Sequence, residues 1–106
     1  MASGRLGVAA IPATTDTTVY TVPVATYTVC SVSITNRNPA PATIRVAMAS
    51  TGTPDLHEWL EYGTTIIANG VFERTGLVMQ AGLNLVVYSD LANVCSSVYG
   101  IETSTA

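Results

Sequence analysis

The chain has 106 residues, which is room for one domain and close to the ~100 residues of a two-sheet β-sandwich. Hydrophobic residues make up 48% of it and charged residues only 10%, a balance that supplies a core and excludes disorder. Four arginines and no lysine stand against seven Asp and Glu, for a formal net charge of −3. Because phosphates are bound by clustered positive charge, no nucleic-acid partner is expected.

The low charge also bears on how the protein exists in solution. Much of its outer surface must be threonine, serine, alanine and apolar atoms, whereas a free monomer usually carries more charge. Interfaces favour arginine and disfavour lysine. The composition therefore predicts an assembly subunit, the alternative being a neutral, soluble β-surface rich in threonine.

The first element is an N-terminal arm, residues 1–12, followed by a β-sandwich domain over residues 13–106. Two glycines make this arm costly to order. We therefore expect an extended arm that a neighbouring subunit holds and that does not belong to its own sandwich. The contacts expected to hold it are those of Arg5, Leu6, Val8 and Ile11.

Period-2 alternation predicts the next strands. Residues 19–22 form a short edge strand that stops at Pro23, and residues 27–35 and 43–50 alternate cleanly. We expect the last two to pair as an antiparallel hairpin across the Asn36-Arg37-Asn38-Pro39 turn. The uncharged stretch 17–36 is long enough for a bilayer, but its threonines and Pro23 favour two strands over a membrane helix.

Beyond residue 50, residues 53–58 predict one helical turn, since Asp55 and Glu58 have the spacing of a helix cap. Short strands separated by turn signals follow, at residues 59–62, 64–67, 71–78, 83–89 and 93–102. Seven or eight short strands without an amphipathic helix predict an all-β fold. The expected architecture is a single antiparallel β-sandwich, immunoglobulin-like or jelly-roll.

Cys30 and Cys95 lie 65 residues apart, about the separation of an inter-sheet disulfide. The apolar run near the start is too short for a signal-peptide core, so a reducing compartment and two free thiols are favoured over a bridge. We expect Cys30 to face the core together with Thr28, Val32 and Ile34.

No residue pattern predicts catalysis, a cofactor or a metal. The stretch His57-Glu58-Trp59-Leu60-Glu61 resembles the H-E-x-x-H motif, but the chain has no second histidine. Serine, His57 and aspartate are all present, so composition allows a Ser-His-Asp set, but the G-x-S-x-G motif of a nucleophile elbow is absent. No glycine-rich nucleotide-binding loop occurs either. Trp59 is interpreted as an anchor, either to the core or to a neighbouring subunit.

Three further charged residues are candidates for an assembly interface. Glu73 and Arg74 are adjacent in a strand-like run, so they point to opposite faces. One of them could meet a charge on a partner, although a charged edge strand explains them equally well. Arg37 is either a solvated turn residue or a contact to another subunit.

Several segments, in their order and spacing, resemble a known family over nearly the whole chain. They are SGRLGVA at residues 3–9, DTTVYTVP at 16–23, SITNR at 33–37, WLEY at 59–62, ANGVFERTGL at 68–77, LVVYS at 85–89 and VYGIE at 98–102. In these the chain resembles small virion structural proteins of tailed bacteriophages, especially aquatic and cyanobacterial phages.

The resemblance implies a non-enzymatic structural subunit of the virion, assembled in the host cytoplasm. It would cement or decorate the capsid, or join tail or neck components, and would contact itself, as a trimer, and other virion proteins such as the major capsid or tail proteins. The alternative is a β-sandwich adhesion module that displays loops to host surface glycans, with Trp59, Tyr62 and Tyr88 as stacking platforms. Neither reading involves nucleic acid or a membrane.

Overall fold

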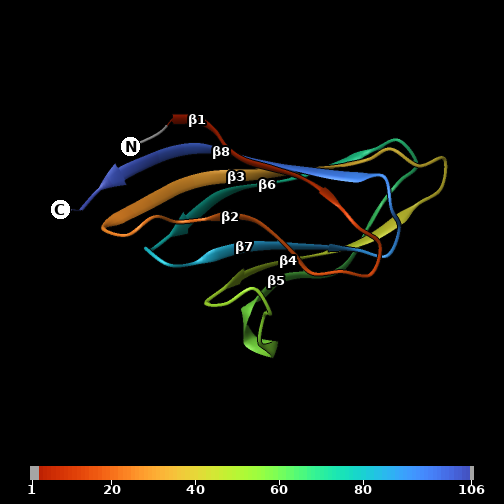
Figure 1. Ribbon diagram of the computed structural model, residues 1–106. Coiled ribbons are helices and arrows are strands. Elements are labelled where there is room, and N and C mark those ends of the chain that lie inside the picture. Colours follow the sequence, from red (N-terminus) through yellow and green to blue (C-terminus); the bar gives the residue numbers. More distant parts are fainter. Residues whose placement is uncertain (1–2, 106) are drawn as a thin grey trace.

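The computed structural model describes residues 3–105, which fold into eight strands in two packed sheets (Figure 1). Sheet A has the strand order β1-β8-β3-β6, and sheet B has the order β2-β7-β4-β5. The strands are β1 Ser3–Ile11, β2 Thr17–Thr21, β3 Thr26–Asn36, β4 Ala42–Ala49, β5 Trp59–Ile66, β6 Val71–Met79, β7 Asn84–Ser89 and β8 Val94–Ser104. Every pairing of these strands is antiparallel.

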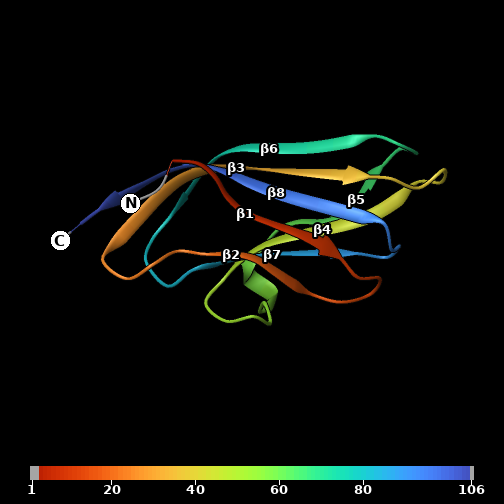
Figure 2. The ribbon, with the colours of Figure 1, turned by 45° about the horizontal axis from the view of Figure 1, so that its top comes forward.

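This strand order identifies which of the two expected sandwiches the chain adopts. Two four-stranded sheets of eight strands with these crossings form a jelly roll. The prediction of an all-β, antiparallel sandwich is confirmed, and the jelly-roll form of it is the observed one. Figure 2 shows the two layers after rotation, with β6 and β3 in one and β4 and β7 in the other.

The core lies between the sheets and follows the alternation of the strands. Val32 and Ile34 of β3 and Ile44 and Val46 of β4 are fully buried. Their β-branched side chains suit a pleated surface, where packing rather than hydrogen bonding fills the gap between sheets. Burial of these inward side chains is the main source of stability, on the order of 2 kcal/mol for each large aliphatic residue.

The predicted arm is wrong for residues 3–11. They form β1, which pairs with β8 along the edge of sheet A, and Ile11 is 2% exposed inside the sandwich. The backbone hydrogen bonds to β8 offset the entropy cost that the glycines impose. Gly7 also has a packing role, because a Cβ atom there would lie 2.3 Å from the carbonyl oxygen of Val19 on β2.

The predicted hairpin between residues 27–35 and 43–50 is also wrong. Both strands exist, but β3 lies in sheet A and β4 lies in sheet B. The residues between them, 37–41, include Pro39 and Pro41, and the buried side chain of Asn36 fixes their path. Its amide nitrogen donates to the carbonyl oxygens of Ala40, at 2.9 Å, and Ile66, at 3.2 Å, so the turn carries the chain across the sandwich.

Two smaller differences concern the middle of the chain. Residues 59–62 and 64–67 were expected as separate strands, but residues 59–66 form the single strand β5, which passes through Gly63 at φ +95° and ends before Ile67. The expected helical turn is present as the short 3-10 helix η1, Leu56–Glu58, which lies outside sheet B (Figure 1). In the part of the chain that the structure describes, no helix has the length and hydropathy needed to cross a bilayer.

Candidate interaction surfaces

The outer face of sheet A carries exposed aliphatic side chains among its serine and threonine residues. Val29 of β3 is 46% exposed, and its cross-strand neighbours Ile101 on β8 and Val78 on β6 are 59% and 65% exposed. These three side chains form one row across adjacent strands. Val8 on β1 and Val71 on β6 add further exposed aliphatic surface to the sheet.

This face has two charged side chains among residues 3–105, and they have opposite signs. Arg5 lies on the edge strand β1, and Glu73 lies on the opposite edge strand β6. The Tyr99 hydroxyl on β8 donates a hydrogen bond to the Glu73 carboxylate. That bond raises the pKa of Tyr99, because the carboxylate stabilises the protonated hydroxyl.

The four candidate contacts of the expected arm divide between the two sides of sheet A. Arg5 and Val8 are exposed on the outer face. Leu6 is half-buried against the core, and Ile11 belongs to the core. Ile11 is therefore excluded as an interface residue, because a neighbouring subunit has no access to it.

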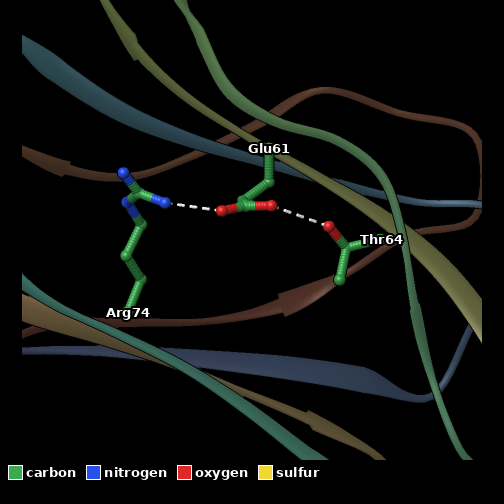
Figure 3. A network of polar contacts seen from close by, with 3 residues as sticks. All are labelled: Glu61, Thr64 and Arg74. Carbon is green, nitrogen blue, oxygen red and sulfur yellow. Dashed lines mark hydrogen bonds and ion pairs between the residues drawn. The ribbon is translucent and has the colours of Figure 1, made fainter.

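Arg74 forms an ion pair within its own chain. Its Nη1 atom lies 2.5 Å from Oε2 of Glu61 on β5, and Thr64 donates its hydroxyl to the other carboxylate oxygen at 2.8 Å (Figure 3). Glu61 and Arg74 point inward from the edge strands β5 and β6, so the pair links the two sheets. The prediction that Glu73 and Arg74 point to opposite faces is confirmed.

The outer face of sheet B holds a row of three side chains that the sequence does not predict as a unit. Arg45 of β4 lies directly opposite Tyr88 on β7 and Tyr62 on β5. The Cζ atom of Arg45 lies 4.2 Å from the ring centroid of Tyr62 and 4.5 Å from that of Tyr88. The guanidinium therefore makes a cation–π contact with each of the two rings.

Trp59 extends this row toward η1. Its ring centroid lies 5.3 Å from that of Tyr62 in an edge-on arrangement, and its side chain packs on Ala47 and Val86. Trp59 thus anchors to its own domain, on the outer side of sheet B. The three aromatic residues proposed as platforms, Trp59, Tyr62 and Tyr88, lie on one face, although they come from strands and not from loops.

Asp55, His57 and Glu58 bring potential ligand atoms within 4.8 Å of one another. The Glu58 carboxylate accepts the backbone N–H of Asp55 at 2.8 Å and that of Ser50 at 3.0 Å. These bonds lower the pKa of Glu58 by stabilising its charged form. The cluster is a cap for η1 and a tie to the end of β4.

Arg37 lies exposed in the turn after β3, and its backbone N–H donates to the carbonyl oxygen of Asn93 at 3.1 Å. The backbone therefore has a structural role. Its side chain stays a candidate contact to another subunit.

The two cysteines are free and lie on opposite sides of sheet A. Cys30 points into the core with Thr28, Val32 and Ile34, as predicted, and burial raises the pKa of its thiol. Cys95 is half-buried beside Thr35, whose side chain points outward. A bridge between them is excluded by this geometry, because strands of one sheet hold the two side chains on different faces.

No pocket was found within residues 3–105. Comparison of the chain with protein-family models, with curated proteins and with solved structures found no significant match.

Proposed function

We propose that this protein is a non-enzymatic structural subunit of a tailed-phage particle, which cements or decorates the capsid or joins tail or neck components. The observation that carries the proposal is the outer face of sheet A. A solvated four-stranded face usually alternates polar residues with the buried ones, whereas this one presents the row of Val29, Ile101 and Val78. Exposed apolar surface of this kind marks interaction sites.

The partner proposed for this face is a second copy of the chain. Strand spacing and rise give the face an area of roughly 550 Å², so pairing it with itself buries about the 1,000 Å² that a specific interface needs. A two-fold axis along the strands places Val29 of one copy opposite Ile101 of the other. It also brings the edge that holds Arg5 over the edge that holds Glu73.

Pairing a face with itself closes at two copies, whereas the expected trimer needs contact between two different surfaces. Light scattering on the isolated protein at micromolar concentration distinguishes the two, and we expect a dimer mass. Val29→Lys should give a folded monomer with an unchanged far-UV circular dichroism spectrum. The matched control is Val24→Lys, because Val24 is 88% exposed outside the strands. A wild-type monomer would contradict self-pairing.

The virion role has a separate test, which is the location and copy number of the chain in purified particles. Mass spectrometry should find it among the particle proteins. Hundreds of copies would indicate a capsid or tail-tube coat, and about a dozen or fewer a vertex, neck or baseplate. Its absence from the particles would contradict the proposed function. In this proposal residues 3–11 serve within the subunit and not as a free arm.

A second candidate function is the adhesion module that binds host surface glycans. The observation that favours it is the row of Tyr88, Arg45 and Tyr62 with Trp59 beside it on the outer face of sheet B. Jelly rolls serve both capsid and lectin domains, so the two functions are compatible in one subunit. Its test is glycan binding by the isolated protein.

A further inference from the structure

The side chain of Arg45 has an unusual combination of order and missing partners. Its Cζ atom lies over the rings of Tyr62 and Tyr88, which come from the strands on either side of β4, and these two contacts hold the side chain in place. Within residues 3–105 this side chain makes no hydrogen bond and no ion pair. The ion pair found there joins Arg74 to Glu61. A guanidinium is nearly always paired when it is partly removed from water, since it has five N–H donors. Arg45 therefore offers donors without an acceptor.

The ring contacts and the burial of Nε limit which donors of Arg45 an acceptor can reach. The Nε atom is buried and without a partner, and the rings of Tyr62 and Tyr88 lie on the two neighbouring strands beside the guanidinium. The terminal nitrogens stay accessible at the end of the side chain. These terminal nitrogens are therefore the donors open to an acceptor, and a guanidinium commonly uses its donors for two parallel hydrogen bonds to a carboxylate.

The surroundings of Arg45 favour a carbohydrate as the carrier of that carboxylate. Tyr62 is 63% exposed, and Trp59 meets it edge-on, so flat apolar surface lies beside the charged group. On the other side, Thr43 and Thr65 form the next cross-strand pair and face outward with hydroxyl groups. Aromatic rings suit the apolar face of a sugar ring, and hydroxyls suit its rim.

We infer that the Tyr88–Arg45–Tyr62 row, with Trp59 beside it, is a binding site for acidic saccharides. Arg45 donates hydrogen bonds end-on to a uronate carboxylate, and the adjoining sugar ring lies on Tyr62. The inference rests on the second proposed function and narrows its ligands to carboxylate-bearing sugars. It also explains why a chain with four cations places one of them beside two aromatic rings on an outer face.

The test is a titration of the isotope-labelled wild-type protein, followed by NMR. The probes are trigalacturonate, the neutral maltotriose and polyglutamate. Trigalacturonate should shift the amides of Tyr88, Arg45 and Tyr62 and should bind more weakly as salt is added. Maltotriose and polyglutamate should leave these amides unshifted.

Each other outcome has a distinct meaning. Equal shifts with both sugars would overturn the selectivity for acidic saccharides but would still support glycan binding at this row. No shift with either sugar would overturn both. Shifts of similar size with polyglutamate would overturn the saccharide and leave a site for charge alone.

Substitution provides the second measurement. Arg45→Lys keeps the charge and loses the planar fork, so affinity for trigalacturonate should fall about tenfold or more. Arg37→Lys is the matched control, since Arg37 lies in an exposed turn away from the row. Unchanged affinity in Arg45→Lys would overturn the role of the guanidinium. If that variant fails to fold, the wild-type titration decides the question.

Discussion

Gly7 of β1 lies against the backbone of Val19 on β2, so closely that a Cβ atom at Gly7 would be 2.3 Å from the Val19 carbonyl oxygen. The two strands belong to different sheets and form one side edge of the sandwich. Because a backbone oxygen cannot rotate away as a side chain can, the contact requires a residue without a side chain.

Gly7→Ala should therefore destabilise the protein. The two strands must move apart to accommodate the methyl group, at a cost of about 1–3 kcal/mol. Urea unfolding followed by circular dichroism measures the change. Gly52→Ala is the control, because the nearest atom to its Cβ would be the Thr18 hydroxyl at an ordinary 3.6 Å. Equal stability of both variants would show that β1 and β2 are not in this contact.

Removal of residues 1–9 tests the position of β1 more directly. The truncation deletes most of the edge strand, leaves β8 unpaired on one side and exposes part of the core beneath it. The melting temperature should fall by about 10 °C or more. A free arm would instead leave the melting curve unchanged, and that result would restore the interpretation of these residues as an assembly arm.

The ion pair between Glu61 and Arg74 should contribute modestly to stability. Its side chains are 26% and 39% exposed, so solvent screens the attraction. A double-mutant cycle with Glu61→Gln and Arg74→Gln should give a coupling energy of about 0.5–1 kcal/mol. A coupling near zero would mean that the two sheets gain nothing from the pair.

Stability should decline at alkaline pH through Tyr20. Burial, together with the hydrogen bond to Glu102, raises the pKa of Tyr20 to about 12 from its ordinary value of 10.0. The folded state therefore retains a proton that the unfolded state loses. This contribution is fully present below pH 10 and is lost as the pH rises toward 12.

Denaturation measured at a series of alkaline pH values should show this decline in the wild type. Tyr20→Phe should show a shallower one, because it has no hydroxyl proton to lose. Identical slopes for the two proteins would contradict the raised pKa. Since burial also raises the pKa of Cys30, a cysteine-to-alanine background at that position separates the two groups.

The two thiols should differ in reactivity. Under native conditions a thiol reagent should modify Cys95 and leave Cys30, which is 3% exposed and 3.8 Å from the Met79 sulfur, unmodified. Intact-mass measurement should give one adduct per chain, and two after unfolding. Because Cys95 pairs with Thr35 on sheet A, its reaction should slow when two copies pair through the outer face of that sheet.

The alternation of the strands was enough to predict which side chains enter the core. Cys30, Val32 and Ile34 face inward as expected, and the alternation of residues 43–50 likewise turns Ile44 and Val46 inward, because period 2 is a property of the strand itself. The same alternation does not specify the neighbouring strand. Residues 27–35 and 43–50 were therefore placed beside each other, although they lie in different sheets.

The candidate surfaces were predictable in part for the same reason. Arg5, Val8 and Glu73 were predicted as candidate interface residues, and all three side chains are exposed. The stacking of Arg45 was not predictable, since Tyr62 and Tyr88 become its neighbours only through the pairing of β4 with β5 and β7. The ion pair of Arg74 was likewise not predictable, because its partner, Glu61, lies on a strand of the other sheet.

The pairing of β1 with β8 has a consequence for how the chain folds as it is made. Ser3 lies opposite Ile101, so the first strand has no partner in its sheet until the last one has been synthesised. Of the six strand pairings within residues 3–105, one joins strands consecutive in sequence, β4 and β5, and it alone among them can form early as a hairpin. Folds dominated by distant contacts fold slowly. Sheet A is therefore completed only after β8 has emerged from the ribosome.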